Sequence, residues 1–543
     1  MSGAALAEVQ RRVLRQLIES LVYEGAITSG GVAGDGVAYC WEERRRFSFD
    51  RVRLGPGPVV RIKPGAALRE ATSPRRFLED IGPVLPADPE RRRRFAAELV
   101  QTVLNDTAVR RHWQEAARPT AGAGYDDLES LVVDGHAYHP SYKSRLGFNA
   151  VDNAEYGPEF ARPIRPVRVA IHRDLARCGA LPGVDPEVVG DHLVVPVHPW
   201  QWRKHAPTTW ASLLADGALV PLGTSDDDYR AQQSIRSLVN VSRPEQPTLK
   251  LALSIVTTST ARTLAPHTVA NAPLITGWLE GIVIRDPYLV GELRPVLLGE
   301  RLGVAHSPEL AAIWRDSIHA HLAPGEEAAP FTALTHVDAT GEAFIAGWVK
   351  EEGVETWARR LLEVTVPPVL HFLVAHGIAL EAHAQNLILI HAHGQPRRLG
   401  LRDFHDGIRF SVAGLAQADG RPALHPTPPE HLRVNRNSYL EAQSDEEVRD
   451  FFHDCLFFVN LAEVAMFLED RFDLAEERFW SLARRVVEDH RRRFPELAER
   501  SARFDVLAQE VSVEQLTTRR LLPDTEVRVQ RVRNPLSAVG GGW

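Results

Sequence analysis

Five side chains that could bind a metal ion or a phosphate group occur close together in the C-terminal half of this chain. Glu381, His383, Gln385 and Asn386 lie in one short stretch, and Asp403 follows further along the chain. Carboxylate and amide oxygens are hard ligands of the kind that Mg²⁺ accepts beside nucleotide phosphates. Glu381, Asn386 and Asp403 are therefore candidate magnesium ligands, while His383 and Gln385 point the other way along the start of a strand.

A predicted β-hairpin brings these two polar clusters together. Residues 387–390 and 399–401 are apolar, and residues 393–396 between them contain Gly and Pro, which favour a turn. The clusters then meet at one end of the hairpin. The order His-x-x-Asn, strand, turn, strand, Asp-Phe also occurs in kinase-like phosphotransferases. A buried polar hairpin is the structural alternative, although so many ligand-competent side chains seldom crowd together without a ligand.

A second polar cluster, within residues 135–148, is basic. It contains His136, His139, Lys143 and Arg145, and its glycines and proline restrict the shape of the loop. Such a loop can hold anions, and a nearby helix N-terminus would add backbone donors for phosphate. A solvated basic loop is the alternative.

A third group of polar residues lies on and after a long strand predicted over residues 249–258. Alternation places the leucines and Ile255 in a core and leaves Lys250 and Thr258 on a face with small neighbours, where a ligand would fit. Arg262 follows and can return its guanidinium toward Lys250. Two cations at one gap suit a substrate with more than one carboxylate or phosphate. The alternative is a surface sheet face with a solvated lysine.

Residues 191–201 predict a buried strand that ends in a proline-containing turn, with His198 and Gln201 at its end. We interpret His198 as a core histidine, with catalysis as the less favoured alternative.

Composition limits the classes of protein and partner. The chain has 543 residues, 44% hydrophobic and 25% charged, with a net charge of −8, which argues against nucleic acid as the main partner. Its three cysteines are far apart, so neither a zinc site nor a disulfide framework is expected. No signal sequence and no apolar run of membrane-spanning length are evident. We expect a soluble, cytoplasmic protein that needs no membrane.

The length predicts several domains, and the pattern of elements suggests their limits. We expect an α+β fold with an N-terminal α+β domain at 1–134, a central domain at 135–350, and a C-terminal domain at 351–543. Helices are predicted at 4–21, 89–104, 445–467, 475–494 and 513–522.

Taken in order along the chain, these motifs resemble those of the siderophore synthetases that act independently of non-ribosomal peptide synthetases, the aerobactin-synthetase-like or IucA/IucC family. The resemblance covers most of the chain and rests on residues 135–148, 196–201, 234–236, 250–262, 381–386 and 402–404. It implies a three-part cupped-hand architecture of thumb, fingers and palm, with mixed or antiparallel sheets and a mostly helical C-terminal region. It also implies that ATP and a polycarboxylate, commonly citrate or a citrate derivative, form an acyl-adenylate with loss of pyrophosphate. An amine or a hydroxyl then attacks to give an amide or ester.

The resemblance also implies roles for individual residues. Arg262, His383 and Lys250 are expected to be catalytic and, with Thr258, to face the carboxylates and the adenylate. The magnesium set would be Glu381, Asn386 and Asp403. The ATP-binding set would be His139, Lys143, Arg145, Ser234, Arg236 and Gln385.

Two other functions stay open: a kinase-like small-molecule phosphotransferase, and a non-catalytic protein that binds carboxylates or siderophores. The kinase-like alternative is disfavoured because the sequence has no Gly-rich phosphate loop followed by a Val-Ala-x-Lys strand. The binding protein is disfavoured by the complete magnesium set. The sequence also leaves open whether the chain forms a homodimer.

Overall fold

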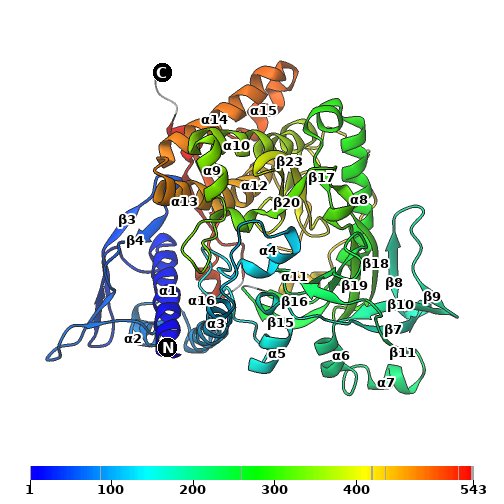
Figure 1. The fold of residues 1–543 in the computed structure, drawn as a ribbon, viewed down its shortest axis with the longest axis horizontal. Helices are drawn as coiled ribbons and strands as arrows, with labels where there is room; N and C mark the ends of the chain where they lie inside the picture. The colour runs from blue at the N-terminus through cyan, green and yellow to red at the C-terminus, as the bar shows by residue number, and fades with distance from the viewer. Residues whose placement is uncertain are drawn as a thin grey trace.

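The computed structural model describes residues 2–539 except 86, 259, 418, 419, 435 and 524. The fold is mixed, with helices and mostly antiparallel sheets (Figure 1). Among the strands of the described residues, the parallel pairing is β17 with β23. The expected mixture of α and β structure is therefore confirmed.

The N-terminal part begins with a long helix, as predicted. Helix α1 (Ser2–Tyr23) buries Val9, Val13 and Leu17 and packs on α3 (Pro89–Ala116), which is longer than the helix expected at 89–104. Beside them lie a four-stranded sheet and a short hairpin. Their strands are β1 (Gly31–Ala33), β2 (Ala38–Cys40), β5 (Val60–Ile62) and β6 (Arg69–Glu70), and β3 (Glu43–Arg45) with β4 (Val52–Leu54).

The middle part of the chain forms two antiparallel sheets, called here the central sheets. Helix α8 (Pro266–Arg285) packs on strands β8 and β18 of the larger sheet. The larger sheet has the order β12 (Tyr229–Ala231), β13 (Ser237–Asn240), β14 (Thr248–Leu251), β19 (Leu310–Arg315), β18 (Glu300–Ser307) and β8 (Arg177–Ala180). The smaller sheet has the order β11 (Leu219–Thr224), β7 (Val167–His172), β10 (His192–Val197) and β9 (Val188–Val189).

The prediction of one long strand over residues 249–258 is wrong in its extent. The chain leaves the larger sheet after β14, and β15 (Leu253–Thr257) pairs instead with β16 (Thr260–Arg262). The expected alternation still holds, since Leu249, Leu251, Leu253 and Ile255 share one core. Ser259, within the predicted 250–262 motif, lies outside the described residues.

The predicted hairpin is confirmed. Strands β22 (Leu387–Ala392) and β23 (Gln395–Leu401) pair antiparallel, with β20 (Glu327–Pro330) and β17 (Val296–Leu297) at the two edges of their sheet. The turn is tighter than expected, because His393 and Gly394 both adopt positive φ, of 50° and 82°. Leu387 lies opposite Leu401, so the residues that precede and follow the hairpin meet at one end.

The C-terminal region is mainly helical. It contains α10 (Val354–His371), followed by the π-helical turn η8 (Phe372–His376), then α12 (Asp445–Phe452), η10 (His453–Leu461), α13 (Ala462–Phe472) and α14 (Glu476–Arg493). The helix expected at 513–522 is wrong. Residues Glu510–Glu514 form β25, which pairs with β26 (Val529–Arg533), and only Thr518–Leu521 form a short helix, α16.

One helical stretch departs from the expectation about apolar runs. Asp445–Phe472 is long and apolar enough to cross a membrane, but 72% of its most apolar window is buried inside the fold. Its side chains belong to the core that also contains α1, α3 and α14, so the apolarity is explained by packing.

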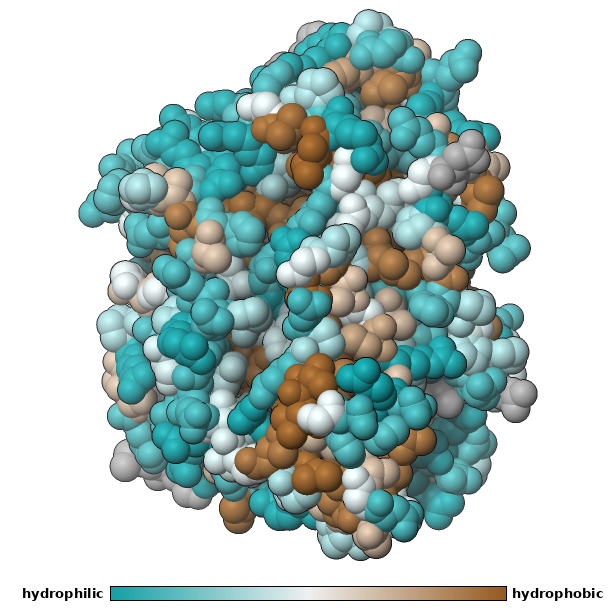
Figure 2. Space-filling model, turned by 90° about the vertical axis from the view of Figure 1, so that its right-hand side faces the viewer, coloured by the Kyte–Doolittle hydropathy of each residue, from teal (hydrophilic) through white to brown (hydrophobic). Residues whose placement is uncertain are grey.

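The N-terminal and C-terminal parts lie side by side at the left of Figure 1 and share one continuous core. A buried ion pair joins them, with Arg46 Nε 2.5 Å from Glu476 Oε1. On the opposite side, the outer surface of the smaller central sheet carries exposed valines, including Val188, Val189 and Val220. Figure 2 shows that side as mainly hydrophilic, with separate small hydrophobic areas.

Candidate active site

One cavity of about 780 Å³ lies where the loop at residues 135–148, the central strands, the hairpin and the C-terminal helices meet. Every residue that the sequence singled out as a site residue lines it. They are His139, Lys143, Arg145, Ser234, Arg236, Lys250, Thr258, Arg262, Glu381, His383, Gln385, Asn386 and Asp403. Residues from distant parts of the chain thus share one space.

Asp403 lies two residues after the end of β23, with a φ of 67° that turns the chain away from the strand. Its carboxylate accepts an ion pair from Lys250, at 3.0 Å between Nζ and Oδ1, and another from Arg315. Burial alone would raise the pKa of Asp403, but Lys250 and Arg315 together hold it well below its usual range. Asp403 is therefore ionised, as a metal ligand must be.

Glu381 and Asn386 are in direct contact. Asn386 donates from Nδ2 to the Glu381 carboxylate at 3.2 Å and to its backbone carbonyl at 3.0 Å. Burial raises the pKa of Glu381 to about 7, and the nearby Asp406 and Asp403 carboxylates add to this effect while Arg409 opposes it. With Asp403, these oxygens form a hard donor set that suits Mg²⁺, and an added cation would relieve the repulsion among the carboxylates.

Arg236 and Arg262 carry positive charges for which the described residues supply no carboxylate partner. Arg262 donates from Nη2 to Thr258 Oγ1 at 2.7 Å, and Arg236 donates from Nη1 to the Thr263 carbonyl at 2.7 Å. Neither guanidinium forms an ion pair with any described residue. Burial and, to a smaller extent, the neighbouring charge of Arg236 lower the pKa of Arg262 to about 10. Two such guanidiniums in one cavity can bind anionic oxygens.

His383 lies between the acidic and the basic parts of the cavity. Its Nε2 is 3.9 Å from Glu381 Oε1. Burial lowers the pKa of His383 to about 4, although Asp403 opposes this effect. The imidazole is therefore neutral at pH 7 and can accept a proton or a hydrogen bond.

The basic loop at residues 135–148 contributes less free charge than the sequence suggested. Lys143 Nζ lies 2.5 Å from Asp106 Oδ1, and Arg145 Nη2 lies 2.7 Å from Glu159 Oε1, so both cations are already paired. His139 is buried, and burial holds its pKa well below the usual value, which leaves a neutral ring. The loop therefore forms a polar cavity wall with its charges balanced.

Several contributors were not found from the sequence. Arg315, at the end of β19, forms an ion pair with Asp403. Glu300 Oε1 lies 2.6 Å from Nδ1 of His405, two residues after Asp403. Asp406 and Asp454 also line the cavity. No local motif marks these residues, because sheet register and helix packing bring them to the site.

His198 lies outside the cavity lining, in line with the core role we expected for it. It caps α6 (Pro199–His205), where its Nδ1 accepts a hydrogen bond from the Trp200 amide at 3.1 Å. The proline-containing turn expected here is thus the first turn of a helix. Gln201 is also buried and bonds to Ser254 at 2.9 Å.

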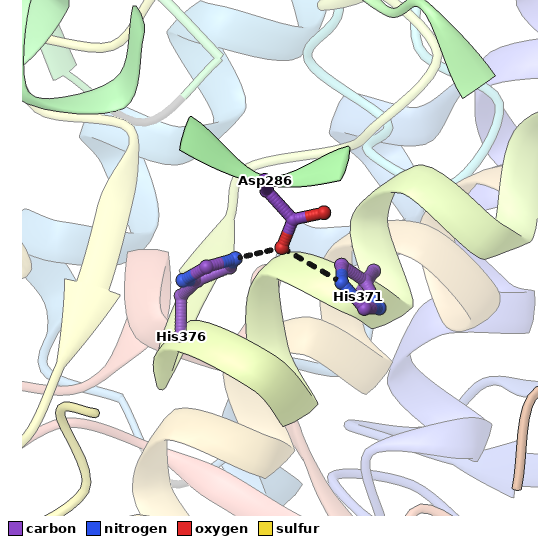
Figure 3. Close-up of side chains that lie close together, drawn as sticks. All are labelled: Asp286, His371 and His376. Atoms are coloured by element: carbon purple, nitrogen blue, oxygen red, sulfur yellow. Dashed lines mark hydrogen bonds and ion pairs between the residues drawn. The ribbon is translucent and has the colours of Figure 1, made fainter. Parts of the chain in front are cut away.

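A separate group of possible metal ligands lies away from the cavity, where the end of α8 meets α10 and η8. Figure 3 shows Asp286 between His371 and His376, whose Nε2 atoms lie 3.0 and 2.8 Å from its Oδ2. The other carboxylate oxygen accepts the amides of Tyr288 and Leu289, and His371 Nδ1 contacts His490 at 2.9 Å. Each Asp286 oxygen is thus satisfied by the protein itself, which indicates a structural role.

Two family models match this chain. The model described as "IucA / IucC family" matches residues 124–336, and the model described as "Ferric iron reductase FhuF-like transporter" matches residues 355–529. Together they cover the central strands, the hairpin and most of the C-terminal helices.

Curated relatives resemble the chain over nearly its whole length. A Staphylococcus aureus protein, 2-[(L-alanin-3-ylcarbamoyl)methyl]-3-(2-aminoethylcarbamoyl)-2-hydroxypropanoate synthase, is 37% identical over 99% of this chain and 94% of the relative. The Bacillus anthracis citryl-spermidine/3,4-dihydroxybenzoyl-citryl-spermidine:spermidine ligase is 36% identical over 97% of this chain and 93% of its own. Among solved structures, the petrobactin biosynthesis protein AsbB from Bacillus anthracis str. Sterne superposes with a TM-score of 0.89 at 36% identity, over 98% of this chain and 96% of that one.

Proposed function

This chain belongs to the IucA/IucC family of siderophore synthetases, and we propose that it joins a citrate-type polycarboxylic acid to an amine. It is an ATP-dependent ligase of siderophore biosynthesis. In the reaction that we propose, one carboxylate of the acid is adenylated with release of pyrophosphate. The amine then displaces AMP to give an amide, while a hydroxyl nucleophile would give an ester.

The observation that carries this proposal is the pair of guanidiniums at Arg236 and Arg262, near the Lys250–Asp403 ion pair. Neither has a carboxylate partner in the part of the chain that the structure describes. Adenylation brings a carboxylate against the α-phosphate, so negative charge accumulates at one place. Fixed cations in a water-poor cavity stabilise that charge, commonly by several kcal/mol. Arg262 is suited to contact both anions, because its planar fork binds two oxygens together.

In the first step, an oxygen of the substrate carboxylate attacks the α-phosphorus, and the bond to the pyrophosphate oxygen breaks. Lys250, Thr258 and Arg262 hold the carboxylates of the acid. The nucleotide is bound by the ATP-binding set given in the sequence analysis. Within that set, Arg236 supplies a positive charge that is not in an ion pair with any described residue. Glu381, Asn386 and Asp403 would hold Mg²⁺, which supplies charge neutralisation on the phosphates when it is bound.

In the second step, the amine nitrogen attacks the acyl carbon, and AMP leaves with the bonding electron pair. The nitrogen must lose a proton. We assign the role of proton acceptor to His383, which is neutral at pH 7 and lies near Glu381. Its role is to move this proton and to orient the adenylate.

The remaining expectations are part of the same proposal. They are the division into thumb, fingers and palm with boundaries at 134/135 and 350/351, a cytoplasmic location, and a homodimer. The core shared by the N-terminal and C-terminal parts indicates that the thumb and palm would fold together.

A screen of polycarboxylic acids with ATP, Mg²⁺ and hydroxylamine tests the function. Hydroxylamine intercepts an acyl-adenylate as a hydroxamate, so the preferred acid gives hydroxamate, AMP and pyrophosphate in equal amounts. ADP formation would indicate a phosphotransferase instead. Binding of acids without any nucleotide turnover would indicate a non-catalytic protein.

A further inference from the structure

The nucleotide side and the metal side of the proposed site lie on two separate turns. The turn at residues 232–236, between β12 and β13, carries two members of the ATP-binding set. Asp403, of the magnesium set, belongs to the turn that follows β23. A short helix, α4 (Tyr125–Leu131), lies near the middle of Figure 1, and its Glu129 contacts both turns.

The two oxygens of the Glu129 carboxylate have different partners. Oε2 accepts the backbone amide of Gln233, in the first turn, at 3.0 Å. Oε1 accepts Nη1 of Arg402, in the second turn, at 2.8 Å, and also the Tyr125 hydroxyl at 2.8 Å. The Glu129 and Arg402 side chains are 1% and 2% exposed, so water does not weaken this ion pair. Glu129 does not line the cavity and therefore acts on the site only through its neighbours.

Arg402 extends this link to the rest of the metal side. Its Nε donates to the Gln385 carbonyl at 2.8 Å, and its backbone amide donates to the Asn386 carbonyl at 3.1 Å. Asn386 is a proposed magnesium ligand, and Asp403 is the residue after Arg402. The Glu129–Arg402 pair therefore holds the backbone on both sides of the hairpin, at the end where the proposed magnesium ligands lie.

A second chain of contacts joins the same two turns. Gln232 Oε1 accepts Nη2 of Arg315 at 2.9 Å, and Arg315 forms an ion pair with Oδ1 of Asp403. Lys250 pairs with the same oxygen. Oδ2 of Asp403 accepts no hydrogen bond from any residue that the structure describes, so it is the oxygen available to a metal ion.

We propose that Glu129 is a positioning residue that couples the binding of the nucleotide to the binding of Mg²⁺. The inference rests on the proposed function, because it takes the 232–236 turn as the nucleotide side and Asp403 as a metal ligand. One carboxylate that holds both turns fixes the spacing between them. A nucleotide bound at one turn then favours the arrangement that the metal ion needs at the other, and the effect is reciprocal.

Glu129→Gln breaks this link without changing the size of the side chain. Every partner of the carboxylate is a hydrogen-bond donor, whereas a glutamine side chain has one oxygen and one NH₂ group. In either orientation the NH₂ group faces a donor, so the contact with one of the two turns is lost. Arg402 also loses its anion, and a lower melting temperature is expected.

Glu476→Gln is a matched control for a buried carboxylate. Oε1 of Glu476 lies 2.5 Å from Arg46 Nε, and its Oε2 accepts the Ser48 amide at 2.8 Å. Its side chain is 2% exposed, as buried as that of Glu129, and it does not line the cavity. This variant should lose stability in the same way but leave both turns of the site in place.

Isothermal titration calorimetry of the full-length protein with α,β-methylene-ATP measures nucleotide binding without turnover, because the analogue replaces the bond that adenylation breaks. The Kd is determined once with Mg²⁺ and once with EDTA, and the ratio of the two values measures the coupling. The wild type is expected to bind about tenfold more tightly with Mg²⁺. Glu129→Gln should remove most of this factor of about ten, while Glu476→Gln should keep it.

Three results would overturn the inference: an unchanged ratio in Glu129→Gln, an equal loss in Glu476→Gln, or a wild type whose affinity does not depend on Mg²⁺. If Glu129→Gln does not fold, Tyr125→Phe takes its place. It keeps the carboxylate but removes a hydroxyl that donates to Glu129 and accepts from Arg402, each at 2.8 Å. Its ratio should also fall, and an unchanged ratio would again refute the coupling.

Hydroxamate formation by the wild type reports the proposed function separately. If hydroxamate forms but the variants keep the full ratio, the role of Glu129 is refuted while the proposed function stands. If no acid gives hydroxamate, the proposed function itself fails, and this inference fails with it.

Discussion

Lys250 Nζ lies 3.0 Å from Asp403 Oδ1, across the junction between the larger central sheet and the hairpin. The sequence predicted separate roles for them: Lys250 was expected to contact the substrate, and Asp403 was expected to bind the metal. In the roles that we propose for them, their contact places the carboxylate end of the site beside the phosphate end. The same ion pair joins β14 to the residues that follow β23, so it has a structural role whatever its part in the reaction.

We expect Asp403→Asn to abolish adenylation and also to lower stability. Lys250 and Arg315 are nearly fully buried, with side-chain exposures of 4% and 2%, and the variant would leave both cations without their anion. Removing one partner of a buried pair typically costs about 3–5 kcal/mol. Differential scanning fluorimetry should therefore show a lower melting temperature. An unchanged melting temperature together with near-normal turnover at limiting Mg²⁺ would remove Asp403 from the site.

We expect Arg262→Lys to reduce kcat/KM for pyrophosphate release although the positive charge is kept. Lysine lacks the planar fork that can bind the carboxylate and the α-phosphate together. A lost charge-assisted hydrogen bond is worth roughly 1.5–3 kcal/mol, or about ten- to a hundredfold. Because the fork tightens on the transition state, the loss should appear in kcat as well as in KM.

Arg397→Lys is a matched control for this change. Arg397 is exposed on β23, and its Nη2 donates a hydrogen bond to Gln395 Oε1 at 3.1 Å. Arg301 is less suitable, because it pairs with both Asp316 and Glu280. If Arg262→Lys were no slower than Arg397→Lys, the assignment of Arg262 to the active site would be wrong.

The hairpin was predictable because its signals are local. The apolar strands, the His-Gly turn and the flanking polar residues are neighbours in sequence, and each follows the ordinary rules of strand and turn formation. Part of the cavity lining was also predictable, because the six motifs and their order resemble one family. What could not be predicted was how those residues pair with one another.

The unpredicted features depend on tertiary contacts. Arg315 reaches Asp403 because β19 pairs with β14 in one particular register, which no local pattern encodes. The single strand expected at 249–258 divides because β15 pairs with β16 instead of continuing in the larger sheet. Residues 513–522 were expected to be helical, but pairing with β26 overrides that local pattern.

We expect His198 to make the protein less stable in mild acid. Burial lowers its pKa to about 3 from the 6.5 of an unfolded histidine. Above pH 6.5 the ring is neutral in both states, but as the pH falls below 6.5 only the unfolded chain takes up the proton, so stability is lost progressively. Between pH 6.5 and pH 5 the loss is about 2 kcal/mol. His198→Asn keeps a helix-capping oxygen and does not titrate. When the pH is lowered from 7.5 to 5, the melting temperature of the wild type should therefore fall further than that of the variant. Equal falls would show that His198 takes up the proton in the folded protein.

We expect Glu381→Gln to weaken the response to Mg²⁺ without unfolding the protein. Glutamine has nearly the same size and can still accept the hydrogen bond from Asn386, but it lacks the negative charge that a hard cation requires. Pyrophosphate release, measured over a range of Mg²⁺ concentrations, should need about ten- to a hundredfold more metal for half-saturation, by analogy with the losses seen around other metal sites. Glu352→Gln, which changes a carboxylate outside the cavity, serves as the control and should match the wild type. A half-saturating Mg²⁺ concentration equal to that of the wild type would exclude Glu381 as a metal ligand, and the magnesium site would then have to be built around Asp403 and other oxygens of the cavity.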